Sequence, residues 1–107
     1  MIADDDTLAG YVEVHGRPPA FEGSDGRPYS AGVFSDDDPG PDGHFGAALL
    51  FIRWSPHQEP DGHLETDHLA RSADPSAAEA EVGRMTLAQV KAALDALIAR
   101  RDAGVRA

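Results

Sequence analysis

Histidines and carboxylates alternate in two short segments of this chain, and such side chains are common protein ligands of transition metals. Glu13 and His15 are two residues apart, and His63, Glu65 and Asp67 repeat that spacing. In an extended strand, residues two apart share one face, so each segment would present its ligands on one side. If the two segments were neighbouring strands, the five side chains could converge on zinc, manganese or iron.

The alternative is that these residues form a polar, solvated strand face. The chain has no HExxH motif and no pair of histidines at helical spacing. It also lacks cysteine, which excludes disulfides, thiolate metal sites and a cysteine nucleophile. No serine lies in a G-x-S-x-G motif, and neither a P-loop nor a G-x-G-x-x-G motif is present. We therefore expect no catalytic activity and no cofactor, with a small metal-dependent or acid/base enzyme as the alternative.

Two Gly-Arg-Pro turns form a second candidate site. Arg17 and Arg27 each precede a proline, which favours an extended backbone at both arginines. Two arginines held in this way beside Tyr29 could form a fork for a carboxylate or phosphate group. The alternative is that they are turn residues that pair with local carboxylates. The acidic loop of residues 36–42 does not fit an EF-hand, because Leu49 stands where the template needs a glutamate.

The net charge of the chain is −10, from 19 acidic and 9 basic residues. This charge disfavours binding to nucleic acid and to anionic membranes, which both need clustered cations. The longest apolar run, residues 45–52, is too short to span a bilayer, and the first residues are acidic where a signal peptide would be basic. We therefore expect a cytoplasmic protein whose acidity serves solubility. A docking surface for a basic protein, or mimicry of DNA, is the alternative.

Hydrophobic periodicity predicts the elements that would position these residues. Alternation of apolar and polar residues predicts strands over residues 8–15, 29–35 and 63–71. Residues 44–54 are apolar at nearly every position, which predicts a strand buried on both faces. Helices follow in the last third of the chain. A start signal at residues 74–76 predicts a short one, and a capping box formed by Thr86 and Gln89 predicts a long one.

Strands followed by helices indicate an α+β fold: a four-stranded antiparallel β-meander with a short helix and a long C-terminal helix packed on one face. Residues 1–7 are predicted to be a flexible N-terminus and residues 8–104 a single domain.

A single long helix covers only one face of such a sheet. The other face needs a different cover, either the short helix with the Gly/Pro-rich segment 16–28 or a second copy of the chain. A large exposed apolar patch usually marks an interface, so we predict a non-catalytic binding or assembly module that is a homodimer, with a protein partner as a further possibility. The interface candidates on strand 44–54 are Leu50, Ile52 and Trp54.

Overall fold

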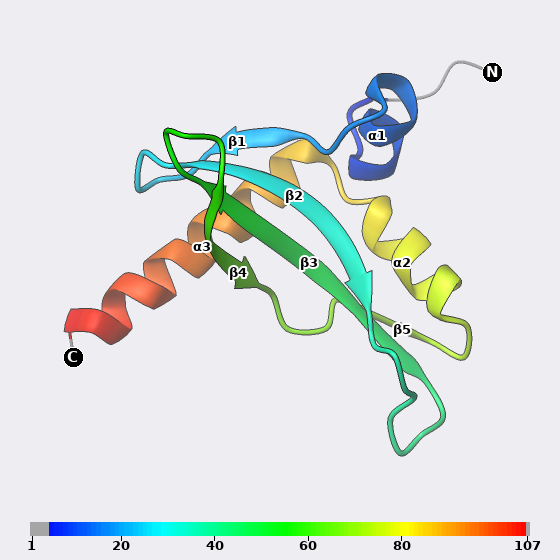
Figure 1. Cartoon of the computed structure of the whole chain (residues 1–107). Helices are drawn as coiled ribbons and strands as arrows, with labels where there is room; N and C mark the ends of the chain where they lie inside the picture. Colours follow the sequence, from blue (N-terminus) through cyan, green and yellow to red (C-terminus); the bar gives the residue numbers. More distant parts are fainter. Residues whose placement is uncertain (1–4, 107) are drawn as a thin grey trace.

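An antiparallel β-sheet forms the centre of the computed structural model, which describes residues 5–106 (Figure 1). Three helices accompany it, one before the sheet in sequence and two after it. The predicted α+β class is therefore confirmed. In chain order the elements are α1 (Leu8–His15), β1 (Ala20–Glu22), β2 (Pro28–Ser35), β3 (Phe45–Trp54), β4 (Pro60–Glu65), β5 (Ala70–Ser72), α2 (Pro75–Gly83) and α3 (Leu87–Arg106).

The strands follow the order β1-β2-β3-β4, so consecutive strands are neighbours, and each pair is antiparallel. On the β4 side of β3, β5 pairs with the first residues of β3. The register sets Ala31 opposite Phe51 and Gly32 opposite Leu50. Because successive residues of a strand point to opposite faces, Phe51 and Leu50 lie on opposite faces of the sheet. The predicted meander is confirmed.

The prediction of a first strand is wrong, because its residues form the helix α1. The hydroxyl oxygen of Thr7 accepts a hydrogen bond from the Gly10 amide at 3.0 Å and so caps the first turn. Gly16 ends the helix with a φ of 68°, a left-handed conformation that glycine adopts without strain. Leu8 and Val12, which alternation assigns to one strand face, are also four residues apart and therefore share a helix face. Their spacing fits both structures, and the two caps favour the helix.

The sheet differs from the prediction at two other places. The short strand β1 lies within segment 16–28, which sequence analysis treats as a connection. The predicted fourth strand is divided into β4 and β5, and β3 pairs with both of them. Between them, the Thr66 amide donates to the Leu49 carbonyl oxygen at 3.0 Å, and the Leu69 amide donates to that of Ala47 at 2.8 Å. The interruption therefore keeps its hydrogen bonds to β3.

Both helices that follow the sheet begin at the predicted signals. At α2, Asp74 Oδ1 accepts a hydrogen bond from the Ser76 amide at 3.0 Å, and a proline occupies the first turn. Ahead of α3, the Thr86 amide donates to the side-chain oxygen of Gln89 at 2.9 Å. The Gln89 amide donates to the Thr86 hydroxyl oxygen at 3.1 Å. These reciprocal bonds confirm the predicted capping box.

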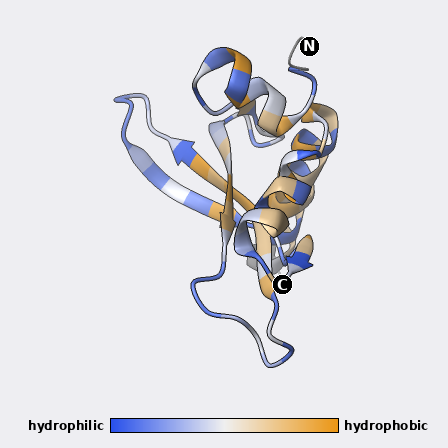
Figure 2. Ribbon diagram, turned by 90° about the vertical axis from the view of Figure 1, so that its right-hand side faces the viewer, coloured by the Kyte–Doolittle hydropathy of each residue, from blue (hydrophilic) through white to orange (hydrophobic). Residues whose placement is uncertain are grey.

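The helices α2 and α3 cover one side of the sheet, as Figure 2 shows, and α1 packs against α2. The core forms between that side and the helices, and a hydrophobic cluster of buried residues joins the sheet to all three of them. The opposite side of the sheet carries no helix within the described residues. The largest fully buried side chains are Tyr29, Phe51, Leu8, Leu49, Leu94, Ile98, Val82 and Val90.

The N-terminal segment, predicted to be flexible over residues 1–7, is described only from residue 5. The Leu87 amide donates to the Asp6 carbonyl oxygen at 2.7 Å, and the Leu8 amide donates to that of Met85 at 2.9 Å. These bonds attach the start of α1 to the start of α3. The first four residues lie outside the described residues.

Candidate functional site

The side of the sheet without helices carries a stripe of partly exposed apolar side chains, which we call the open face: Phe34, Leu50, Ile52 and Trp54. Phe34 lies on β2 and the other three side chains lie on β3, so the stripe crosses both strands. The register sets Ile52 opposite Ser30 and Leu50 opposite Gly32. Trp54 Nε1 donates to the Ser30 hydroxyl oxygen at 3.0 Å, so the indole ring lies over β2. All three predicted interface residues belong to the open face.

Polar residues of β4 border the open face. The register sets Glu65 opposite Leu50 and His63 opposite Ile52. Nε2 of His63 is 3.5 Å from Oε1 of Glu65, and both side chains are exposed to solvent. A shallow depression of about 390 Å³ lies between these polar residues and the apolar stripe. An apolar centre with a polar border is the usual organisation of a protein interface.

A histidine covers the first residues of β3 on the same side of the sheet. A Cβ atom at Gly46 would overlap the ring of His68, which explains why only a small residue fits there. Nε2 of His68 is 3.1 Å from Oδ1 of Asp36, and the Gly46 amide donates to Oδ2 of Asp36 at 3.2 Å. His68 and Asp36 therefore close one end of the open face.

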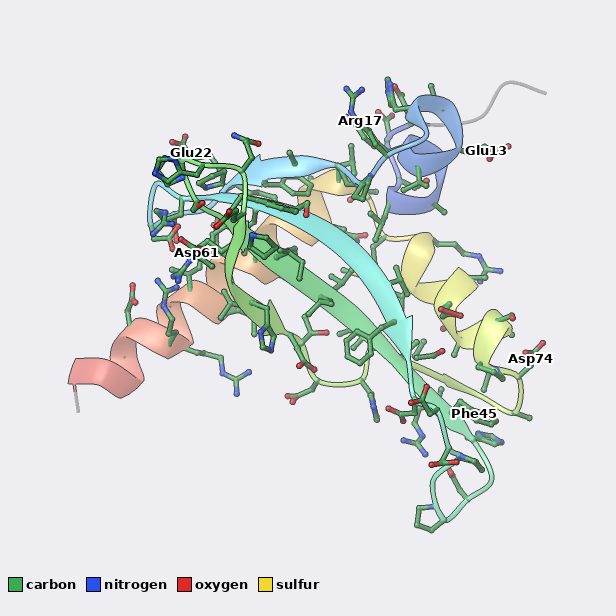
Figure 3. All side chains as sticks on the ribbon, viewed as in Figure 1. Glu13, Arg17, Glu22, Phe45, Asp61 and Asp74 are labelled. Atoms are coloured by element: carbon green, nitrogen blue, oxygen red, sulfur yellow. The ribbon has the colours of Figure 1, made fainter. Side chains whose placement is uncertain are left out.

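The five predicted metal ligands do not come together. Glu13 and His15 lie on α1, whereas His63 and Glu65 lie on β4 and Asp67 follows it. Figure 3 shows Glu13 on the outer side of α1, away from β4. Across residues 5–106, no group of three or more histidine and carboxylate side chains is arranged to hold a metal ion. The convergence requires two neighbouring strands, and the first of them is a helix.

The arginines of the two Gly-Arg-Pro turns also lie apart. Arg17 is exposed in the loop between α1 and β1, while Arg27 donates to Oδ2 of Asp61 at 2.6 Å. Figure 3 shows Arg17 and Asp61 at well-separated positions. Tyr29 is buried, and its hydroxyl donates to Oδ2 of Asp25 at 2.7 Å. The structure therefore does not bring these three candidates into one fork.

A polar network that sequence analysis missed connects α3 with the β1–β2 turn. Arg101 donates from Nη1 to the Tyr29 hydroxyl oxygen at 3.3 Å and from Nη2 to Oδ2 of Asp25 at 3.1 Å. Arg53 lies opposite Tyr29 in the register and donates from Nε to Oδ1 of Asp61 at 2.8 Å. Asp61 also receives Arg27, so one carboxylate holds two arginines. The network fixes the turn and the end of β3 to the helix.

The pKa values in this network are shifted in directions that preserve the ordinary charges. Burial raises the pKa of Asp25, but hydrogen bonds from the Tyr29 hydroxyl, the Arg27 amide and Arg101 outweigh it and leave that pKa lowered. Burial and the hydrogen bond to Asp25 raise the pKa of Tyr29. The hydrogen bond with Tyr29 raises the pKa of Arg101. None of these three groups is therefore tuned to exchange a proton near neutral pH, as general acid–base catalysis needs.

Two charged residues of α3, Asp95 and Arg101, contact the β1–β2 turn. Asp95 Oδ1 accepts a hydrogen bond from the Ser24 amide at 2.9 Å, and Arg101 reaches the turn as described. Arg101 lies three residues after the buried Ile98, so both can contact the same part of the sheet. Arg101 thus continues the apolar stripe of α3. A charged residue in such a position is the sequence signal for a contact with the sheet.

No family model, curated protein or solved structure matches this chain. No helix of the described residues combines the length and apolar character needed to cross a membrane. The side chains of the polar network are already bonded to one another, whereas the apolar side chains of the open face remain partly exposed. The open face is therefore the surface of the two that is available to a partner.

Proposed function

We propose that this chain is a non-catalytic assembly module that forms a homodimer by packing its open face against the open face of a second copy. One observation supports this proposal: α2 and α3 cover the same side of the sheet and leave Leu50, Ile52 and Trp54 partly exposed on the other. Two sheets packed face to face form a core about 10 Å thick. Each copy would supply the second layer that the other lacks.

The energetics of this dimer combine an apolar gain with an electrostatic cost. Buried tryptophan often dominates the binding energy of an interface, which assigns Trp54 a central role. Each copy carries a net charge of −10, so the two copies repel each other. Salt screens this repulsion without weakening the apolar contact. The dimer is therefore expected to become more stable as the ionic strength increases.

The proposed module acts in the cytoplasm and does not bind nucleic acid. The acidity of the chain argues against a nucleic-acid partner, and the absence of cysteine is in keeping with the cytoplasm. The proposed role requires no cofactor. A different protein is the alternative occupant of the open face, and the carboxylate of Glu65 at its border would favour a cationic one.

Sedimentation velocity over a wide range of protein concentrations tests this proposal. The wild-type chain is expected to form a dimer, and Leu50→Glu is expected to be a monomer with an unchanged circular-dichroism spectrum, because it places a charge in the centre of the open face. Val14→Glu is the matched control, since Val14 is an exposed apolar residue of α1 outside the open face.

Two results would contradict the open-face dimer. One is a wild-type chain that stays monomeric at every concentration. The other is a Leu50→Glu variant that assembles as the wild type does.

A further inference from the structure

A groove of about 440 Å³ lies between α1, α2 and the border of the sheet, and it contains no residue of the open face. Figure 1 shows both helices beside the part of β2 that continues past β1. Two buried residues, Leu8 and Ala31, form part of its wall. Pockets of about 300–1,000 Å³ with mostly apolar walls are typical binding sites for small molecules. The groove has the size and the character of such a site.

The packing of α1 against α2 keeps this groove open. A Cβ atom at Gly83 would lie 3.0 Å from Cβ of Ala9, so the two helices touch at that point. Val12, one turn farther along α1, is 41% exposed although it is a large apolar residue. The wall from α2 consists of four residues spaced by three or four positions, which places them on one helix face: Ser76, Glu79, Ala80 and Gly83.

Glu79 is the one charged residue that lines the groove in the part of the chain that the structure describes. The residue is partly buried, and among residues 5–106 its carboxylate has neither an ion pair nor a hydrogen bond. A carboxylate beside an apolar wall gains more from a cationic partner than one in open solvent, because water screens it less. Glu79 therefore offers the groove a fixed negative charge.

The backbone of β2 supplies a second acceptor. The Ala31 amide donates to the Pro19 carbonyl oxygen at 3.1 Å, on the side of β2 away from β3. Alternate residues of an antiparallel ladder bond to the same side, so the Val33 carbonyl also points away from β3. β1 pairs only with residues 28–30, so it does not reach Val33. Val33 lines the groove, and its carbonyl oxygen can accept a hydrogen bond there.

We infer that the groove binds a small organic cation, a primary amine attached to a compact apolar body. The apolar body replaces water against Leu8, Val12 and Ala80. The ammonium group has three N–H donors and no acceptor, which suits the Glu79 carboxylate and the Val33 carbonyl oxygen. A hydrogen bond between an ammonium and a carboxylate is stronger than one between neutral groups.

Charge selects this ligand over other molecules with an apolar body. A fatty acid or a phosphate ester would bring its anion close to Glu79, and no cationic side chain of the described residues lines the groove to offset it. A neutral molecule of the same shape would leave Glu79 without a partner. The net charge of −10 attracts cations to the surface of the chain.

An NMR titration of the isotope-labelled wild-type chain with phenethylamine tests this inference. The amide resonances of Val33 and Ala80 are expected to shift and to saturate as the amine is added. Phenethyl alcohol has the same ring and chain without the charge. It should bind about fivefold more weakly, as expected for the loss of one partly exposed ion pair.

Glu79→Gln separates the charge from the shape of the groove. The variant should bind phenethylamine about fivefold more weakly and phenethyl alcohol as the wild type does. The matched control is Glu81→Gln, which removes the same charge from an exposed position of α2 outside the groove. It should leave the affinity for both compounds unchanged.

Ala80→Phe tests the location of the site, because the larger side chain fills the groove. Both compounds should then bind at least about tenfold more weakly, since their apolar contact is lost. Ala77→Phe is the matched control at an exposed position of α2 outside the groove, and it should bind both as the wild type does. If Ala80→Phe does not fold, the two glutamate variants decide the matter.

Four results would overturn the inference. Phenethylamine could produce no saturable shift, or phenethyl alcohol could bind equally well. Glu79→Gln could bind the amine as the wild type does, or lose no more affinity than Glu81→Gln, which would indicate an effect of net charge alone. The open-face dimer is tested separately, because a monomeric chain that binds phenethylamine as expected refutes the dimer and supports the groove.

Discussion

The two faces of β3 have similar side chains and different surroundings. Ala47, Leu49 and Phe51 point toward the helices and are fully buried, with 0% of their surface exposed. Leu50 and Ile52 alternate with them along the same strand and remain partly exposed on the open face. Both sets are apolar, so residue type does not explain the difference. It arises because α2 and α3 both pack on one side of the sheet.

An apolar run therefore indicates that a strand can be buried on two sides. It does not report whether one chain supplies both covers. The run from Phe45 to Ile52 predicts a strand buried on both faces. A single copy buries both faces over residues 46–49, whereas Leu50 and Ile52 stay partly exposed on the open face. The remaining apolar face is what motivates the proposed dimer. Substitutions that act on one face of the sheet at a time test whether the two faces differ in this way.

The largest expected effect comes from truncating one side chain on each face. Phe51→Ala should lower the free energy of unfolding by about 3–5 kcal/mol, because it leaves a cavity in the core. Ile52→Ala should lower it by only about 1 kcal/mol, since Ile52 is already partly exposed in a single copy. Urea unfolding in the Leu50→Glu background, where the proposed dimer does not contribute, measures both values. Equal losses would mean that the two faces are equally packed.

Adding a methyl group to one glycine on each side of the sheet should change the free energy of unfolding by an intermediate amount. A Cβ at Gly23 would lie 2.6 Å from Cδ1 of Ile98 and 2.9 Å from Cε1 of Tyr29, whereas a Cβ at Gly32 meets no atom within 4 Å. Gly23→Ala should therefore destabilise the chain by about 1–3 kcal/mol through overpacking.

Gly32→Ala is the matched control on the open side, and it should be neutral or slightly stabilising, because alanine reduces the freedom of the unfolded chain. Thermal unfolding of the two variants makes the comparison. A larger loss for Gly32→Ala than for Gly23→Ala would contradict the assignment of the open side.

The smallest expected loss of stability comes from breaking the polar network on the covered side of the sheet. Arg101→Gln removes two hydrogen bonds at the edge of the core, and we expect it to cost about 1 kcal/mol at neutral pH, as partly exposed ion pairs do. Arg71→Gln, which breaks an exposed pair with Asp42 at the other end of the sheet, should cost less. Chemical denaturation of both variants measures the difference.

The same network predicts how stability depends on pH. The pKa of Asp25 is lower in the folded chain than its ordinary value of 3.8, so its contribution is fully present above that value. The contribution is lost as the pH falls through the folded pKa. Asp25→Asn should therefore weaken the loss of stability between pH 4 and more acidic solutions, as thermal unfolding would show. An unchanged acid profile would show that Asp25 does not contribute.

Local signals in the sequence predicted several elements correctly. The apolar run identified β3, and the capping box identified the start of α3, because both depend on neighbouring residues only. The assignment of residues 8–15 to a strand failed because Leu8 and Val12 fit both periods. The contact of Arg101 with Tyr29 and Asp25 was not predicted, because these partners are more than seventy positions away in sequence. No periodicity detects such a contact.

The candidate sites show the same division between signals from neighbouring residues and contacts between distant ones. The apolar run predicted side chains on both faces of β3 and so singled out Leu50, Ile52 and Trp54, because the period of a strand is fixed by its backbone. Long-range packing placed α2 and α3 on one side of the sheet and the predicted metal ligands on separate elements. Those facts depend on which distant elements pack together, and that choice follows from burial and hydrogen bonding summed over the whole chain.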